Sequence, residues 1–405
     1  MSKPLTRAQE SVARAEAWND YQVAEKQNYS RQEEVMYETM YFDEGTKSHG
    51  YVEKNAVAMR YASFDIGLPG ENGYPLYIAL HGGGQTLMNE QQFKNMQEYY
   101  RTSVQNGIYV ACRGIRETYN THFNPESYPL YDRLIQNMIL FKNVDPNRVY
   151  ILGFSAGGDG VYGTTPCMPD RFAAVAMSAG HHNQTSPINY MNTPILLQCG
   201  EEDTAYDRHL ETARYGEKLK DLQAKHPGHY IHEVNMHVKR PHNFRDNNAN
   251  RNKQVVWEDS GAWLKNEAKP DGLKAVCKNT NSIDFLNKFT RNPLPKNIAW
   301  NLATRAPLRL TNSYYWLKAN QSITEGIIHA EWDKNTFTIK TEGVSGKIQI
   351  LLNWDMVDFD QPINLVVNGQ THQEKAIPTL EIIEETTKER GDVNYQFSAI
   401  VEVTV

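Results

Sequence analysis

The spacing of apolar residues changes twice along the chain, which divides it into three parts. Residues 1–50 are polar and helical in pattern, with one apolar stripe at helical spacing. The members of this stripe are Leu5, Ala8, Val12, Ala15 and Trp18. Thr6 and Gln9 stand at the spacing of a capping box, which predicts that the helix begins just after Thr6. The pattern therefore predicts an N-terminal helical extension (1–50) that lies on the surface of the main domain.

From about residue 55 to 265, apolar runs alternate with amphipathic helical stretches. The strand-like runs are AVAMRYASFDIG, PLYIALHG, GIYVACRG, RVYILGFS, FAAVAMSAG, PILLQCG and HYIHEVNMHV. Near-continuous apolar strands that alternate with helices predict a mostly parallel sheet with helices on both faces. We place this α/β domain at residues 51–294. In such sheets, ligands bind at the carboxyl ends of the strands.

The last part of the chain has a different texture. NTFTIKTEG, GKIQILLNW, PINLVVNGQTH and YQFSAIVEVTV are short strand-like runs, and Asn368-Gly369 is typical of a type I′ hairpin. Residues 295–405 are therefore predicted to form a small all-β, sandwich-like domain. The connection RNPLPKNIAW is Pro-punctuated, whereas a flexible tether would be Gly/Ser-rich, so we expect the domain to dock on the rest. The aromatic run 314–316 (Tyr-Tyr-Trp) fits the core of a sandwich, or a surface that stacks on a sugar.

Composition narrows the class of protein. Hydrophobic residues make up 40% of the chain and charged residues 22%, which is typical of a globular protein. The net charge of −6 and the lack of a basic block argue against nucleic acid, and no run approaches the ~20 apolar residues of a membrane span. The four cysteines are widely spaced, and Cys112 and Cys199 lie in apolar runs where reduced, buried thiols are expected. The N-terminus has no apolar signal segment, so we expect a cytoplasmic protein with neither nucleic acid nor a membrane as partner; a secreted form without its leader is left open.

Chemically active residues follow four of the predicted strands. HGGG comes after PLYIAL, and its glycines can turn their N–H groups towards a developing oxyanion. Ser155, in GFSAGG, stands at a strand-to-helix turn. The carboxylates of GEED follow PILLQC, while His237 ends the last strand and His242 stands in the loop after it. Because all these strands end at one edge of a parallel sheet, we expect the side chains to meet there.

This order of glycine loop, serine, acid and histidine is that of the catalytic triad in α/β-hydrolases. Residues 75–265 resemble esterases of that superfamily, with similarity to dienelactone hydrolases and polyhydroxybutyrate depolymerases in VDPNRVYILGFSAGGDGVY, PDRFAAVAMSAGHHN and GEEDTAY. The similarity continues through FTRNPLPKNIAW and LLNWDMVDFDQPINLVVNG, whereas the first 50 residues carry none. The resemblance implies an α/β-hydrolase fold and a serine carboxylic-ester hydrolase, acting on a small-molecule ester without a metal or organic cofactor.

The resemblance also implies roles for individual residues. Ser155 is the expected nucleophile, and the N–H groups of Ala156 and of Gly83 or Gly84 are the expected oxyanion hole. No metal ligand is expected at the two histidines that follow MSAG, since no carboxylate or cysteine stands at ligand spacing from His181-His182.

The acid and the base each have competitors. The resemblance maps the acid onto Asp203, with Glu202 as the alternative and Glu201 as an exposed carboxylate. In α/β-hydrolases the base lies on the loop after the last strand, which favours His242, and His237 is the alternative. The acid would hold the tautomer of the histidine and stabilise the imidazolium that forms.

One further residue and two other functions stay open. Arg113 directly follows a strand, where it can clamp a substrate carboxylate or form a structural salt bridge. A peptidase or amidase of the prolyl-oligopeptidase kind would use the same triad, but the roughly 50 residues before the hydrolase region are too few for a β-propeller. Alternatively, the triad is vestigial and the chain binds a ligand through its β domain. The pocket walls of this fold come from loops, so the sequence leaves the substrate and the oligomeric state open.

Overall fold

The computed structural model describes most of the chain. The described residues are 4–42, 47–48, 51–52, 57–84, 86–244, 256–257, 260–265, 282–303, 312–320 and 322–405. By its contacts the chain divides into two units, residues 33–291 and residues 1–32 with 292–405. None of the helices in the described ranges is long and apolar enough to cross a membrane.

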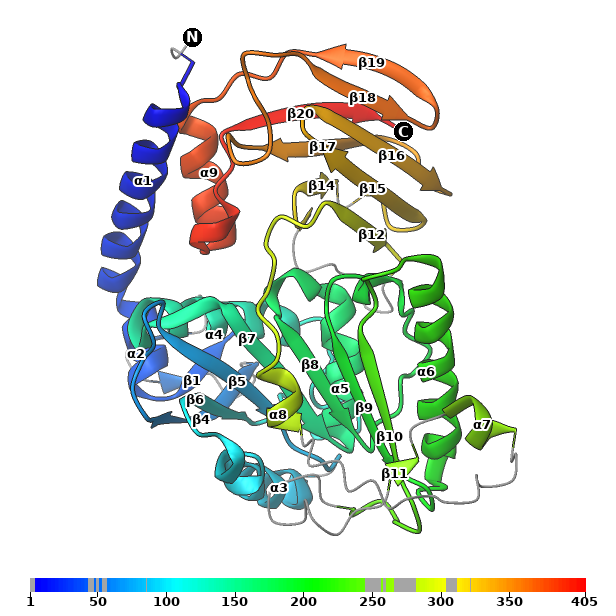
Figure 1. Cartoon of the computed structure of the whole chain (residues 1–405). Helices are drawn as coiled ribbons and strands as arrows, with labels where there is room; N and C mark the ends of the chain where they lie inside the picture. Colours follow the sequence, from blue (N-terminus) through cyan, green and yellow to red (C-terminus); the bar gives the residue numbers. More distant parts are fainter. Residues whose placement is uncertain are drawn as a thin grey trace. The chain divides into compact units, whose positions relative to one another are not determined.

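The unit 33–291 is built on one large sheet (Figure 1). Across this sheet, the strands formed by described residues are β1 (Thr39–Tyr41), β4 (Ala58–Ile66), β6 (Gly107–Cys112), β5 (Tyr74–Leu80), β7 (Val144–Phe154), β8 (Ala174–Ser178), β9 (Ile195–Gly200), β10 (His232–His237) and β11 (Val256–Trp257). The run from β6 to β10 is parallel, whereas β1, β4 and β11 pair antiparallel with their neighbours. The predicted mostly parallel sheet is confirmed.

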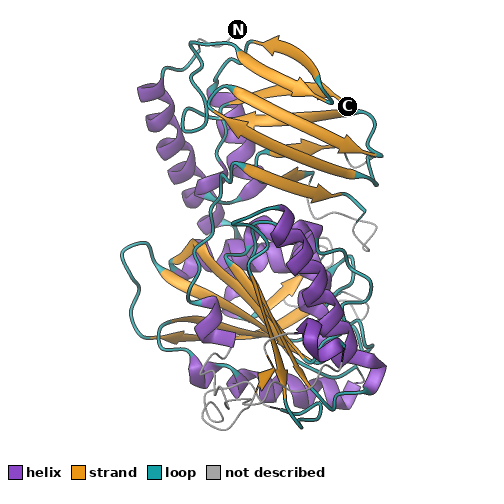
Figure 2. Ribbon diagram, turned by 45° about the vertical axis from the view of Figure 1, so that its right-hand side comes forward, coloured by secondary structure: helices purple, strands orange, loops and turns teal. Residues whose placement is uncertain are grey.

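Helices lie on both faces of this sheet (Figures 1 and 2). The helices of the unit that the structure describes are α3 (Thr86–Tyr99), α4 (Ser127–Lys142), α5 (Ala156–Thr164), α6 (Arg208–Lys225), α7 (Ser260–Leu264) and α8 (Ser282–Leu286). Tyr77 and Ala79 of β5 pack in one core with side chains of α3 and α8, such as Phe93. The alternate residues Leu76 and Ile78 are equally buried, so the opposite face is also covered. Burial on both faces explains why these strands read as continuous apolar runs.

Residues 292–405 form two β-sheets, as the sequence predicts (Figure 2). One sheet holds β12 (Asn297–Asn301), β15 (Ile327–Asp333), β16 (Thr336–Glu342), β18 (Ile363–Val367) and β19 (Gln370–Glu374), and the other holds β13 (Ser313–Tyr314), β14 (Leu317–Ala319), β17 (Lys347–Leu352) and β20 (Ala399–Thr404). Side chains from both sheets share one apolar core. The predicted Asn-Gly hairpin is confirmed, since Asn368 and Gly369 have φ of 49° and 84° and join β18 to β19.

We call residues 1–32 and 292–405 the β unit, and its aromatic run is part of its core. Tyr314, Tyr315 and Trp316 are almost fully buried. The ring of Tyr314 stacks on Trp300, and Nε1 of Trp316 donates to the carbonyl of Pro295 at 2.8 Å. These rings therefore present no face to a sugar, and the stacking surface considered from the sequence is wrong.

The N-terminal helix α1 (Arg7–Gln27) has the predicted capping box at Thr6 and Gln9. It is followed by α2 (Tyr29–Met36), and β2 (Lys47–Ser48) pairs with β3 (Tyr51–Val52) further on. The face that α1 buries differs from the predicted stripe, because Val12 is 57% exposed. The buried side chains of the helix are those of Glu10, Ala13, Ala17 and Tyr21.

The sequence predicts that α1 lies on the surface of the main α/β domain. In the structure, however, α1 packs within the β unit. Ala13 and Ala17 share a small core with Ile383 of α9 (Leu380–Arg390). The carboxylate of Glu10 accepts from the backbone N–H of Trp354 at 3.1 Å and from the hydroxyl of Ser398. Two alanines permit close approach of the helices, and a buried carboxylate is tolerated because it is hydrogen-bonded. Hydrophobicity alone could not reveal this face.

Candidate active site

Ser155 stands on a sharp turn between β7 and α5. Its φ of 58° and ψ of −122° are strained for a residue with a side chain. The turn is tight enough that a Cβ on Gly153 would lie 2.2 Å from the carbonyl oxygen of Gly157, and a Cβ on Gly157 would lie 2.0 Å from that of Leu80. Ala156 is the first residue of α5, where a backbone N–H has no partner within the helix. The Gly-x-Ser-x-Gly pattern is thus required by sterics.

Ser155, His242 and Asp203 form one hydrogen-bonded chain. Nε2 of His242 lies 2.9 Å from Oγ of Ser155, and its Nδ1 lies 2.7 Å from Oδ2 of Asp203. An ionised carboxylate only accepts, so Nδ1 carries the proton that bonds Asp203. In the neutral ring, Nε2 then accepts the Ser155 hydroxyl. This tautomer can take up the hydroxyl proton of Ser155.

Of the three carboxylates that follow β9, Asp203 is the buried one. Glu202 is exposed, and the carboxylate of Glu201 accepts from the backbone N–H of Lys239 at 2.8 Å. Burial among polar partners suits Asp203 to orient a histidine, because its charge is weakly screened there.

Three features decide the fold of this unit. They are the strand order around β5 and β7, the turn at Ser155, and the succession of serine, acid and histidine along the chain. Residues 33–291 form an α/β-hydrolase fold. We call them the α/β-hydrolase unit, and each member of the hydrogen-bonded chain lies just after a strand of its sheet.

The loop after β5 passes beside the serine. A Cβ on Gly82 would lie 3.1 Å from Cβ of Ser155, so the backbone of Gly82 adjoins this side chain directly. The two glycines expected to supply oxyanion N–H groups come next: Gly83 has a φ of 118°, and Gly84 lies under the ring of Tyr119. Sequence reasoning passed over Gly82, although the HGGG motif contains it.

Two buried histidines fix this loop. Nε2 of His81 accepts from the N–H of Gly114 at 3.0 Å, and its Nδ1 donates to the carbonyl of Gly82 at 2.6 Å. Nε2 of His122 donates to the carbonyl of His81 at 2.9 Å. Burial lowers the pKa of His81 to about 4, so this ring is neutral at pH 7 and keeps one tautomer. No sequence motif points to His122, which lies 41 positions away from His81.

Arg113 lies in an ion-pair network. Its guanidinium bonds the carboxylate of Glu117, lies 3.6 Å from that of Glu90, and donates to the carbonyl of Gly114 at 2.8 Å. The side chain is buried. These contacts favour the structural salt bridge over a clamp for a substrate carboxylate.

The other candidate histidines have partners of their own. Nε2 of His237 lies 3.0 Å from Oε1 of Gln198, and its ring stacks on Phe244. Nε2 of His182 lies 2.6 Å from a carboxylate oxygen of Glu211. His237, the alternative base, is thus engaged away from Ser155.

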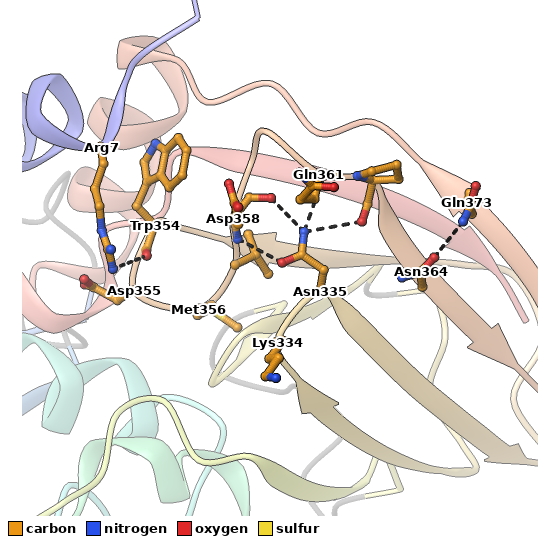
Figure 3. Close-up of a pocket in the computed structure, with 12 residues that line it drawn as sticks. Arg7, Lys334, Asn335, Trp354, Asp355, Met356, Asp358, Gln361, Asn364 and Gln373 are labelled. Atoms are coloured by element: carbon orange, nitrogen blue, oxygen red, sulfur yellow. Dashed lines mark hydrogen bonds between the residues drawn. The ribbon is translucent and has the colours of Figure 1, made fainter.

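A pocket of about 810 Å³ lies in the β unit, which does not contain Ser155 (Figure 3). Its walls include Arg7 and the loop between β17 and β18. The side-chain amide of Asn335 donates to the carbonyl of Asp358 at 2.7 Å, and its oxygen accepts from the N–H of the same residue at 2.9 Å. This amide holds the wall of the pocket together.

Comparisons with known proteins give structural likeness only. No family model matches the chain, and no curated protein matches it. Similar solved structures include a thermostable esterase (19% identity, TM-score 0.37, covering 63% of this chain and 63% of that one) and a poly(3-hydroxybutyrate) depolymerase from Bordetella parapertussis (17%, 0.37, 55% and 89%). A carboxylesterase from Mesorhizobium loti is also similar (15%, 0.33, 46% and 88%). The match thus spans less than two thirds of the first of these chains, and at these values the likenesses bear on neither substrate nor mechanism.

Proposed function

We propose that the chain is a serine carboxylic-ester hydrolase. The observation that carries the proposal is the unbroken hydrogen-bonded chain from Ser155 through His242 to Asp203. A hydroxyl bonded to a neutral imidazole, whose other nitrogen is held by a buried carboxylate, is the arrangement that activates a serine as nucleophile. The strained turn at Ser155 supports the same role, since it keeps the side chain clear of the strand and helix that flank it.

In the acylation step, Oγ of Ser155 attacks the acyl carbon while Nε2 of His242 takes the hydroxyl proton. The carbonyl oxygen becomes an oxyanion, and the N–H of Ala156 with an N–H of the 82–84 loop donates to it. The C–O bond to the alcohol then breaks, and the imidazolium of His242 gives its proton to the departing oxygen. Asp203 stays ionised throughout and stabilises that imidazolium.

In the deacylation step, water attacks the acyl-Ser155 ester. His242 takes a proton from the water and returns it to Oγ of Ser155 as the carboxylic acid leaves. Residues that act as one unit lose activity together, so loss of Ser155 or of His242 alone should have nearly the full effect.

The test is the hydrolysis of a panel of p-nitrophenyl esters, methyl esters and aminoacyl amides by the wild type and Ser155→Ala. We expect the wild type to cleave esters, and the variant to lose about three or more orders of magnitude in kcat with its fold unchanged. A fluorophosphonate probe should modify Ser155 and no other serine, as read by peptide mass spectrometry. Cleavage of the amides in preference to the esters would favour the peptidase. An unlabelled Ser155 together with an inert wild type would favour the vestigial triad.

A further inference from the structure

Large apolar side chains are exposed on segments that follow strands of the α/β-hydrolase unit. Leu87 is 88% exposed in the first turn of α3, after the glycine loop of β5, Tyr119 is 63% exposed on the loop after β6, and Tyr206 is 69% exposed on the segment after β9. A large apolar side chain exposed beside a site marks a candidate contact for a ligand. These segments start at the same sheet edge as the residues proposed for catalysis.

The ring of Tyr119 packs directly against the loop of residues 82–84, which follows β5. A Cβ on Gly84 would lie 2.4 Å from Cδ1 of this ring, so only a glycine lets the ring approach that closely. Gly84 is two residues after Gly82, which adjoins Ser155. Two residues span at most about 7 Å, so the ring of Tyr119 packs one short loop segment away from the backbone that adjoins Ser155. This proximity suits contact with the substituent of an ester whose carbonyl lies at Ser155.

The loop that carries Tyr119 is held in shape by its own hydrogen bonds. The N–H of Ile115 donates to the carbonyl of Thr121 at 3.0 Å, and the hydroxyl of Thr121 donates to the carbonyl of Arg116 at 2.7 Å. The guanidinium of Arg116 bonds the carboxylate of Glu126 at 2.5 Å. A ring held by such a loop loses little freedom when a ligand stacks on it, and this favours binding.

Tyr206 flanks the acid. It has a φ of 57°, and the next residue, Asp207, has a φ of 55°, both in a region that costs energy for residues with side chains. The guanidinium of Arg208 lies 4.9 Å from the ring of Tyr206 and 3.7 Å from the carboxylate of Asp203. The strained turn thus sets a second exposed ring close to the residue that orients His242.

We propose that the site takes esters that carry an aromatic ring, and that Tyr119 is the surface on which this ring stacks. The inference rests on the proposed function and adds the substrate class. Aromatic pairs prefer offset-stacked or edge-to-face contact and contribute beyond the area they bury. Each such ring pair should raise kcat/KM for the aromatic ester by about 3- to 10-fold.

The experiment compares pairs of esters in which a small alkyl group replaces the aromatic ring. Methyl 3-phenylpropanoate against methyl butanoate probes a ring on the acyl side, and benzyl acetate against propyl acetate probes the alcohol side. We expect the wild type to prefer one aromatic ester of these pairs, through a lower KM. Tyr119→Ala should lower kcat/KM for that ester by about 3- to 10-fold more than for its aliphatic counterpart, while Tyr119→Phe should behave as the wild type.

A tyrosine elsewhere on the α/β-hydrolase unit serves as control. Tyr37, which is 65% exposed before β1, should tolerate Tyr37→Ala without change in any of the four esters. Equal losses on aromatic and aliphatic esters in Tyr119→Ala would mean that the ring only supports Gly84, and would overturn the inference. No aromatic preference in a wild type that cleaves aliphatic esters at Ser155 would overturn it too, with the proposed function intact. A wild type inert on every ester, with Ser155 unlabelled, would instead remove the proposed function.

Discussion

Nε2 of His237 lies 3.0 Å from Oε1 of Gln198, inside the sheet that carries the candidate active site. The amide oxygen only accepts, so His237 donates through Nε2 and holds one tautomer. Burial lowers the pKa of this histidine to about 3, which keeps the ring neutral over the physiological range. His237 is therefore a structural neighbour of His242, five residues away in sequence and different in role.

The two histidines should separate cleanly by substitution. His242→Ala removes the group proposed to transfer protons, so kcat for a p-nitrophenyl ester should fall by about three or more orders of magnitude at unchanged stability. His237→Asn keeps a side chain that can bond Gln198 and should retain most of the activity. Steady-state kinetics with circular dichroism as a folding check would decide. An active His242→Ala beside an inactive His237→Asn would move the base to the strand end.

Acid should unfold the protein through its buried neutral histidines. His81 and His237 have folded pKa values of about 4 and about 3, whereas an unfolded histidine titrates near 6.5. The unfolded chain then binds more protons, so the stabilisation is complete above about pH 6.5 and is lost as the pH falls towards 4. At pH 5, protonation of each histidine should lower the free energy of unfolding by about 2 kcal/mol relative to its value at neutral pH.

Urea midpoints at pH 7.5, 6.5, 5.5 and 5 measure this loss, and His237→Gln provides the comparison. This variant should be less stable than the wild type at pH 7.5 but should lose less stability on acidification. If both proteins lose the same amount between pH 6.5 and 5, His237 does not titrate as its burial implies.

A substitution at Gly157 tests whether steric clash or helix propensity dominates at the turn that carries Ser155. Gly157 lies in the first turn of α5, where alanine would normally stabilise a helix by up to about 1 kcal/mol. Its added Cβ would lie 2.0 Å from the carbonyl oxygen of Leu80, however, so the turn at Ser155 must shift. We expect Gly157→Ala to lose about 100-fold or more in kcat and several kcal/mol of stability.

Gly70→Ala is the matched control for this substitution. Its Cβ would meet only the carbonyl oxygen of Gly73, at an ordinary 3.5 Å. Activity and the urea midpoint should match the wild type. A fully active Gly157→Ala would show that the turn has room that the geometry denies.

Whether a feature could be predicted from the sequence depends on how far apart along the chain its contacting residues lie. The strands, the Asn-Gly hairpin and the glycines around Ser155 were predictable because each depends on neighbours along the chain. The hydrogen bond between His122 and His81 joins residues that lie 41 positions apart in the sequence, and no local pattern predicts it. Arg113 is intermediate: Glu117 lies four residues further along the chain, whereas Glu90 comes from α3, so the sequence left the clamp and the salt bridge as alternatives.

The last prediction concerns the face of α1 that hydrophobicity misassigned. Ala15 belongs to the predicted apolar stripe and is exposed, whereas Ala17 is buried against α9 with Ile383. Ala17→Leu adds three carbons to a packed contact between two helices and should lower stability by about 1–3 kcal/mol. Ala15→Leu makes the same chemical change on the exposed face, where the effect should stay within about 0.5 kcal/mol.

Both variants are compared by denaturant unfolding, followed through tryptophan fluorescence, to which the β unit contributes Trp18, Trp300, Trp316, Trp332 and Trp354. Because two units can unfold separately, the transition that shifts must be the one reported by these residues. Greater damage from Ala15→Leu than from Ala17→Leu would restore the stripe of Leu5, Val12 and Trp18 as the packed face. The opposite result places the buried surface of α1 on its alanines, because close helix packing and a hydrogen-bonded Glu10 outweigh the larger apolar side chains.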